Sequence, residues 1–209
     1  ANQSPRLERS LYVHAHKAIL GTSMSDLNLT NRFLIAMPTL EDPNFGHTVT
    51  YMCAHSVEGA MGIVINRPLE IDLGEVLEQM KMSTGNLDIT SRTVYQGGPV
   101  HQDRGFVIHR PAKEWNSTIT ITPEVGISTS RDILEAISGG TGPADALVAL
   151  GYAGWGAGQI EHEIAQNAWL SGPADLEIIF QTPVDKRWQR AADLIGVDLA
   201  SISHDIGHS

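Results

Sequence analysis

The single cysteine of the chain, Cys53, is followed two positions later by His55, in the run YMCAHS. The β-branched and aromatic neighbours predict a strand over 48–54, and residues two apart in a strand point to the same face. A thiol beside an imidazole can act as a thiolate nucleophile or a redox sensor, because a neighbouring cation lowers the thiol pKa. Free cysteines are more often small buried hydrophobes, and that interpretation is favoured. Cys53 and His55 are the catalytic candidates of this sequence.

The histidines give no readable metal site. Cys53 and His55 could hold a metal ion only with partners such as His47, His101 or His109, which the sequence does not place together. In EHE, residues 161–163, adjacent side chains point to different helix faces, and the zinc-helix spacing H-E-x-x-H is absent. We therefore predict neither a metal nor a cofactor, and no set of residues marks an enzyme.

Two short motifs, NRP at 66–68 and YQGGPV at 95–100, follow predicted strands. They would bring polar groups and bare backbone to one edge of the sheet, where mixed folds commonly bind ligands. Two ordinary turns are the competing interpretation. An arginine at a predicted helix start is a further candidate, because guanidinium groups bind anions well. The candidate ligand-binding residues are Asn66, Arg67, Gly97, Gly98, Pro99 and Arg131.

The run GYAGWGAGQIEHEIAQNAWL, residues 151–170, joins a predicted strand to a predicted helix through glycines. That frame also occurs in phosphate-binding loops, where backbone N–H groups meet an anion. The G-K-[ST] ending is missing, and the chain has no Lys or Arg from Asp132 to Asp185. Glu161 and Glu163 near the helix start would repel a phosphate. The glycines are better explained by backbone angles and close helix-to-sheet packing.

The elements that must position these residues indicate an α+β fold with a mixed sheet and about four helices in a single domain. Helix starts are predicted at Asp72–Glu75, Thr129–Asp132 and Thr182–Asp185, and a fourth helix follows the glycine run. Predicted strands cover Arg32–Met37, Thr48–Ala54, Met61–Asn66, Thr93–Gln96, Gly105–His109, Ser117–Thr122, Ala146–Tyr152 and Leu176–Phe180.

Length and charge narrow the class of protein. A chain of 209 residues with 42% hydrophobic residues fits one globular domain, and no window approaches the roughly 20 apolar residues of a membrane span. We interpret residues 1–23 as a leader or an extension and 24–209 as the domain. Without Arg6, Arg9, Lys17 and Glu8, the remaining 11 basic and 23 acidic residues give a formal charge of -12.

This acidic charge disfavours direct nucleic-acid binding, whose affinity comes largely from Lys and Arg. A single cysteine allows no intrachain disulfide and is typical of a reducing compartment. We therefore predict a cytoplasmic protein. The sequence leaves its oligomeric state open.

Five separated motifs together resemble the YqgE/AlgH family of small bacterial proteins. They are LTNRFLIAMPTLEDPNF, EGAMGIVINRP, YQGGPV, TSRDILEAISGG and LGYAGWGAGQIEHEIAQNAWL, and the similarity runs from about Asn28 to the C-terminal GHS. The resemblance implies a single α+β domain with a mixed sheet and no established catalytic activity. It also implies a role in regulating alginate production, sometimes described as transcriptional.

Two hypotheses follow. In the first, the protein is a regulatory or adaptor protein that binds a protein partner or a small ligand near Asn66, Arg67 and the turn 97–99. In the second, it is a thiol-dependent enzyme or redox sensor that uses Cys53 with His55. The first is favoured, because the motif residues gather in turns without a catalytic set.

Overall fold

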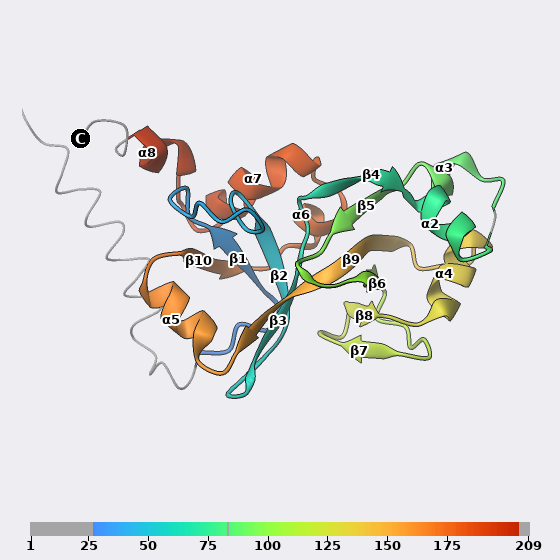
Figure 1. The fold of residues 1–209 in the computed structure, drawn as a ribbon, viewed down its shortest axis with the longest axis horizontal. Coiled ribbons are helices and arrows are strands. Elements are labelled where there is room, and N and C mark those ends of the chain that lie inside the picture. The colour runs from blue at the N-terminus through green and yellow to red at the C-terminus, as the bar shows by residue number, and fades with distance from the viewer. Residues whose placement is uncertain (1–26, 83, 205–209) are drawn as a thin grey trace, which may run out of the picture.

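A computed structural model describes residues 27–82 and 84–204, so the predicted leader over residues 1–23 lies outside the described residues. The described chain forms an α+β domain around one long, strongly bent sheet (Figure 1). The strands are β1 (Arg32–Ala36), β2 (Val49–Ser56), β3 (Gly59–Val64), β4 (Pro68–Asp72), β5 (Thr93–Gln96), β6 (Val100–Arg110), β7 (Thr118–Thr120), β8 (Gly126–Ser128), β9 (Asp145–Gly156) and β10 (Trp169–Pro173).

The sheet is mixed, as predicted. Its main path runs in the order β10-β1-β2-β3-β9-β6-β8-β7, and β5 joins β9 from the side and carries β4. The β5–β9 pair is parallel, and the other pairs along the sheet are antiparallel. The long strand β9 therefore belongs to both halves of the sheet, pairing with β5 and β6 in its first half and with β3 in its second.

Glycines make one close chain crossing feasible. β5 and β6 pair with the same stretch of β9 from opposite sides, so the three residues Gly97–Pro99 carry the chain across β9. A Cβ on Gly98 would lie 2.1 Å from the Tyr152 carbonyl carbon, and one on Gly151 would lie 2.5 Å from the Gly98 oxygen. Gly151 also has a φ of +73°, which side chains other than glycine rarely adopt. The glycines of YQGGPV and of LGYAGWG thus allow these two segments to come into close backbone contact.

The helices are more numerous than the four predicted. They are α2 (Leu73–Gln79), α3 (Leu87–Thr90), α4 (Arg131–Ser138), α5 (Gln159–Ala165), α6 (Leu176–Phe180), α7 (Arg187–Asp193) and α8 (Leu199–His204), with a 3-10 turn η2 (Val184–Lys186) before α7. The capping box predicted at the start of α2 is present, since Asp72 accepts from the Glu75 N–H and Glu75 accepts from the Asp72 N–H, each at 3.0 Å. The additional helices are short, and their periodicity is correspondingly hard to recognise.

The strand predicted over Leu176–Phe180 is wrong, because this segment is helix α6. A five-residue apolar run fits either structure, and here Asp175 decides the outcome by accepting from the Ile178 N–H at 3.0 Å as an N-cap. The glycine run also differs from the prediction. Its residues 153–156 continue β9 as a strand, and the turn is confined to the residues just before α5.

Three apolar clusters hold the helices on the sheet. Successive residues of β2 face opposite ways, so Tyr51 packs with α6 and α7 while Met52 packs with α5. The third cluster joins α2 and α4 to the other half of the sheet. Figure 1 shows this arrangement, with α5 at one end of the domain and α2, α3 and α4 at the other.

Candidate functional site

Cys53 and His55 lie on opposite faces of the sheet, which contradicts the expectation that they share one. In the β2–β3 pair, Met52 stands opposite Gly62 but Ala54 stands opposite Met61, so Cys53 is an extra residue in a β-bulge. The bulge reverses the alternation that follows it. Cys53 is buried in the cluster of Tyr51, and burial raises the pKa of its thiol to about 12. The structure therefore provides neither a thiol–imidazole pair nor an activated thiol.

His55 instead ties three elements together. Its Nε2 lies 2.8 Å from Oε1 of Glu161 on α5, and its Nδ1 accepts from the backbone N–H of Leu29 at 3.1 Å. Because Nδ1 accepts, the ring proton is on Nε2 and points to the carboxylate. The second oxygen of Glu161, Oε2, is buried and has no hydrogen-bond partner among the described residues. This pair holds the segment before β1 against β2 and α5.

Glu163, one helical turn from Gln159, fixes two tryptophans. Its Oε2 accepts from Nε1 of Trp155 at 3.0 Å and from Nε1 of Trp169 at 2.8 Å, while its Oε1 accepts from the Gln159 side chain. Phe45 stacks on Trp155 and meets Trp169 edge-on, with ring centroids 5.9 and 5.5 Å apart. The acidic residues of EHE are thus engaged inside the protein, whereas His162 between them is exposed.

The polar groups of Asn66 and Arg67 are directed to the neighbouring loop. Asn66 accepts from the Val49 N–H and donates to the His47 carbonyl. The Arg67 guanidinium donates to the carbonyls of Pro43, Asn44 and Gly46 at 2.7, 2.6 and 3.2 Å. These bonds hold the loop that carries Phe45 over the tryptophans. The motifs LEDPNF and INRP are therefore parts of one contact.

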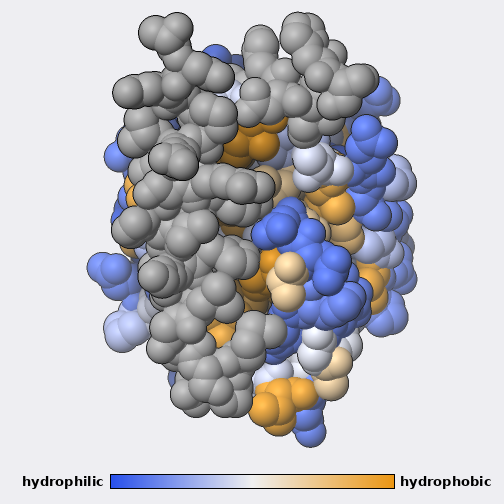
Figure 2. Space-filling model, turned by 90° about the vertical axis from the view of Figure 1, so that its left-hand side faces the viewer, coloured by the Kyte–Doolittle hydropathy of each residue, from blue (hydrophilic) through white to orange (hydrophobic). Residues whose placement is uncertain are grey.

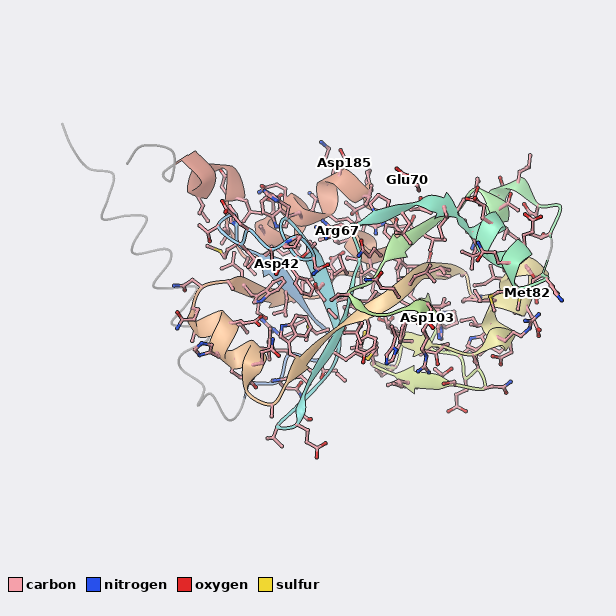
Figure 3. All side chains as sticks on the ribbon, in the orientation of Figure 1. Asp42, Arg67, Glu70, Met82, Asp103 and Asp185 are labelled. Atoms are coloured by element: carbon pink, nitrogen blue, oxygen red, sulfur yellow. The ribbon has the colours of Figure 1, made fainter. Side chains whose placement is uncertain are left out.

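The remaining predicted residues are divided between two places. Gly97 lies beside β3 and β9, because its carbonyl accepts from Val64 and its N–H donates to Leu150. Arg131 is elsewhere, at the start of α4, where it donates to the Met80 carbonyl at 2.9 Å and pairs with Glu135. Figure 3 shows the separation, with Arg67 near the middle of the domain and Met82, close to Met80, near one end.

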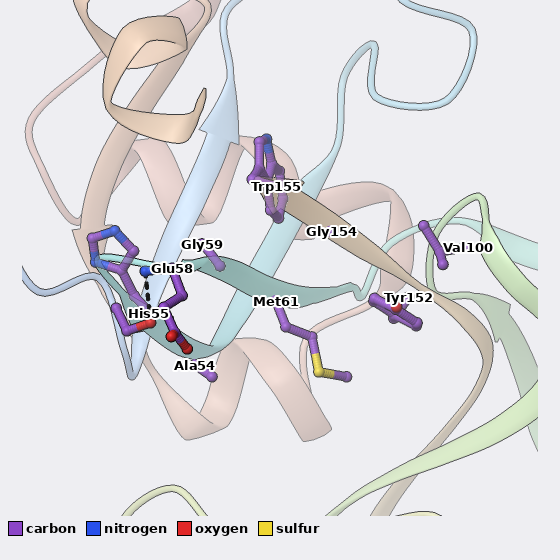
Figure 4. A pocket seen from close by; sticks show the side chains of 11 residues that line it. Ala54, His55, Glu58, Gly59, Met61, Val100, Tyr152, Gly154 and Trp155 are labelled. Atoms are coloured by element: carbon purple, nitrogen blue, oxygen red, sulfur yellow. Dashed lines mark hydrogen bonds between the residues drawn. The ribbon is translucent and has the colours of Figure 1, made fainter. Parts of the chain in front are cut away.

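A shallow depression lies next to the turn Gly97–Pro99. It has a volume of about 560 Å³ and is lined by Ala54, His55, Ser56, Glu58, Gly59, Ala60, Met61, Val100, Tyr152, Gly154 and Trp155. In Figure 4, Met61 and Tyr152 lie on one side of the two strands and Trp155 on the other. The depression therefore takes residues from both faces of the β3–β9 pair, and most of its side chains are apolar.

The hairpin between β2 and β3 forms one end of the depression. Val57 at its tip is 87% exposed, the largest exposure among the described large hydrophobic residues, and the adjacent Glu58 is exposed as well. Figure 2 shows an apolar group projecting beside hydrophilic atoms at the lower end of the molecule, where this hairpin ends in Figure 1. The exposed apolar tip and the mostly apolar depression therefore lie next to each other.

The depression carries few reactive side chains. Its ionisable side chains are Glu58, the Tyr152 phenol and the already engaged His55, and none of the described Lys or Arg residues lines it. Within residues 27–82 and 84–204, no group of three or more His, Cys, Asp or Glu side chains could hold a metal ion. No helix of the described chain is both long and apolar enough to cross a bilayer.

Sequence reasoning missed Met61, Tyr152 and Glu58 as surface residues. Met61 and Tyr152 lie inside predicted strands, where their apolar side chains indicate core positions. The bulge in β2 and the crossing at Gly151 explain why they border a depression instead. The exposed pair Val57–Glu58 could have been found as the tip of a hairpin, since it stands before Gly59 between two predicted strands.

The fold and the site together describe an α+β protein with a bent mixed sheet and a shallow, mostly apolar depression. The AlgH-like family (DUF179) matches residues 33–200, and the chain belongs to this family. A UPF0301 protein of Thioalkalivibrio sulfidiphilus is 58% identical over 182 residues, which cover 87% of this chain and 97% of that protein. A UPF0301 protein of Nitrosococcus oceani is 53% identical over 179 residues, covering 86% and 96%.

Two solved structures have a similar fold. The solution structure of the AlgH protein from Pseudomonas aeruginosa is 46% identical, with a TM-score of 0.73, and the match covers 90% of this chain and 100% of that one. A crystal structure from Corynebacterium diphtheriae shares the fold at 16% identity, with a TM-score of 0.68 and coverage of 89% and 96%. The predicted family is therefore confirmed.

Proposed function

We propose that this protein is a regulatory or adaptor protein that binds a protein partner through the depression beside the β2–β3 hairpin. The observation that carries the proposal is the combination of an apolar depression with Val57, 87% exposed, at its edge. Solvent-exposed apolar surface of this kind costs free energy until a partner covers it. The absence of an activated thiol at Cys53 favours this proposal over the redox hypothesis.

The charge of the protein supports regulation by protein contact. A formal charge of -10 repels the phosphate backbone of nucleic acids, so regulation by direct DNA contact is disfavoured. The single cysteine supports a cytoplasmic location, because proteins of reducing compartments do not depend on disulfides.

Site-specific photo-crosslinking in living cells tests the proposal. A photoreactive amino acid replaces Val57, and the matched control places it at Leu87, which is 79% exposed in α3 at the other end of the domain. We expect a discrete protein adduct from position 57 alone, which is lost when Met61→Glu puts a charge into the depression. The same adducts from both positions, or none from position 57, would contradict the proposal.

The predicted contact of Asn66, Arg67 and Arg131 with the partner is tested separately. Both guanidinium groups already donate to backbone carbonyls, so their replacement also loosens local structure. We expect Arg67→Ala to weaken the Val57 adduct, because the Arg67 carbonyl accepts from the N–H of Gln96, which precedes the turn Gly97–Pro99 beside the depression. We expect Arg131→Ala to leave the adduct unchanged. An adduct unaffected by either change would limit the partner surface to the depression.

A further inference from the structure

β9 has an open edge inside the depression. Its residues 145–150 and Tyr152 pair with β6, and its residues 153–156 pair with β3 on the opposite side. β6 begins at Val100, opposite Tyr152, so beyond this point no strand among the described residues continues its line along β9. The chain before Val100 turns across β9 at Gly98, so the described residues leave this edge without a paired strand.

The backbone of Gly154 faces the open edge. A Cβ on Gly59 of β3 would lie 2.3 Å from the Trp155 oxygen, which places the Trp155 carbonyl on the β3 side. Backbone directions alternate along an antiparallel strand, so Gly154 and Gly156 point away from β3. The N–H of Gly156 accordingly donates to the Gln159 side chain at 3.0 Å. Gly154 is exposed and lines the depression, so its N–H and carbonyl are accessible to a partner chain.

The side chains around this edge define what could lie there. Met61 and Tyr152 provide apolar surface on one face, and Trp155 contributes on the other. Glu58 is the exposed carboxylate of the depression, and no Lys or Arg of the described residues lines it, in a protein whose formal charge is -10. An extended segment with alternating apolar and basic residues complements both features, because its apolar side chains would cover Met61 and Tyr152 and a cation would lie near Glu58.

We propose that the depression binds an extended, basic segment of a partner protein, which adds to the sheet as a strand along β9 at Gly154. The segment lies in line with β6 and exchanges backbone hydrogen bonds with Gly154, the mode of recognition known as β-augmentation. Glycine at this position leaves the face beside Tyr152 and Val100 free of a further side chain. This inference rests on the proposed function and names the chemistry of the partner at the same site.

Fluorescence anisotropy with three labelled synthetic heptapeptides tests the inference. The first alternates Val and Lys, the second alternates Val and Glu, and the third is the Val–Lys peptide with alternate backbone amides N-methylated to remove the strand hydrogen bonds. We expect the Val–Lys peptide to bind at least about tenfold more tightly than either of the other two, which corresponds to about 1.4 kcal/mol. Equal binding of the N-methylated peptide, or of the Val–Glu peptide, would overturn strand addition or charge selection, respectively.

Protein variants locate the binding. Gly154→Val puts a branched side chain against Tyr152, since a Cβ there lies 3.2 Å from Cε2, and should abolish binding with the circular dichroism spectrum unchanged. Glu58→Lys should weaken the Val–Lys peptide several-fold, while the matched control Glu114→Lys, at an exposed position outside the depression, should not. Equal losses from Glu58→Lys and Glu114→Lys would mean general charge attraction and would overturn the placement.

The two proposals fail separately. An adduct at position 57 without peptide binding would leave the partner-binding role intact and overturn strand addition. Peptide binding without an adduct in cells would leave strand addition intact and overturn the cellular role. Dimerisation in solution that competes with the peptide would mean that a second copy of the chain covers this edge, which also overturns the proposal of a basic partner.

Discussion

The contact most open to quantitative test is Glu163 with its two tryptophans. Glu163→Ala removes a carboxylate that accepts from two indole N–H groups at 3.0 and 2.8 Å. Trp155 and Trp169 are 6% and 3% exposed, so neither N–H can readily find water instead. A buried donor left without a partner costs about 1–3 kcal/mol, so two of them predict a loss of about 3 kcal/mol in the free energy of unfolding.

The assay is urea unfolding followed by circular dichroism and tryptophan fluorescence. For a domain of this size, a loss of about 3 kcal/mol corresponds to a melting temperature lower by roughly 6–12 °C. Glu163→Gln keeps a neutral acceptor of the same shape, so it should cost about half as much as the alanine change. His162→Ala is the control, because His162 is exposed on the same helix.

The reasoning would be refuted if Glu163→Ala cost no more than His162→Ala. It would also be refuted if the glutamine and alanine variants were equally destabilised, since the hydrogen-bond acceptor would then not be the relevant property. A loss confined to fluorescence, with unchanged stability, would show that the indole groups reorient without affecting the fold.

Three further predictions concern the crossing, the thiol and a buried histidine. Gly151→Ala should destabilise the protein more than Gly158→Ala, because both glycines have a φ of +73° but only at Gly151 would a Cβ collide, 2.5 Å from the Gly98 oxygen; equal losses in urea unfolding would contradict this. Cys53 should react with iodoacetamide far more slowly in the native protein at pH 7 than in urea, because burial raises its pKa to about 12; equal rates would show that it is accessible. Burial lowers the pKa of His109, so below about pH 6.5 the unfolded chain takes up a proton that the folded protein does not, and the free energy of unfolding decreases as the pH is lowered, by up to about 1.4 kcal/mol per pH unit. His109→Gln should reduce this slope, and an unchanged slope in urea titrations would exclude His109 as its source.

Much of the architecture could be predicted from local sequence signals. The capping box at Asp72–Glu75 and the strand at Thr93–Gln96 depend on neighbouring residues, and both occur where they were expected. The segment Leu176–Phe180 could not be assigned in this way, because five apolar residues fit either a strand or a helix. Strand β8 was missed because its three residues are too few to show an alternation. Strand β10 was missed because its partner β1 is distant in the sequence.

The candidate site depended on tertiary structure to a greater degree. Spacing alone put Cys53 and His55 on one face, and a single bulged residue in β2 reversed this relation. The motif NRP can be read in the sequence, but only the fold shows that Asn66 and Arg67 hold the loop of Phe45. The ligand-binding role predicted for them remains a prediction.

The sequence by itself determined the family, the acidic charge and the α+β class, because these depend on composition and on motifs that are continuous in the chain. Only the tertiary structure decided where the open edge of β9 lies. That edge arises because Gly97–Pro99 crosses β9 at Gly151 and ends the β6 pairing at Val100, and such a crossing joins backbone groups about fifty residues apart. Glycines in either motif alone predict a turn, whereas together they permit two segments of the same chain to pass within contact distance.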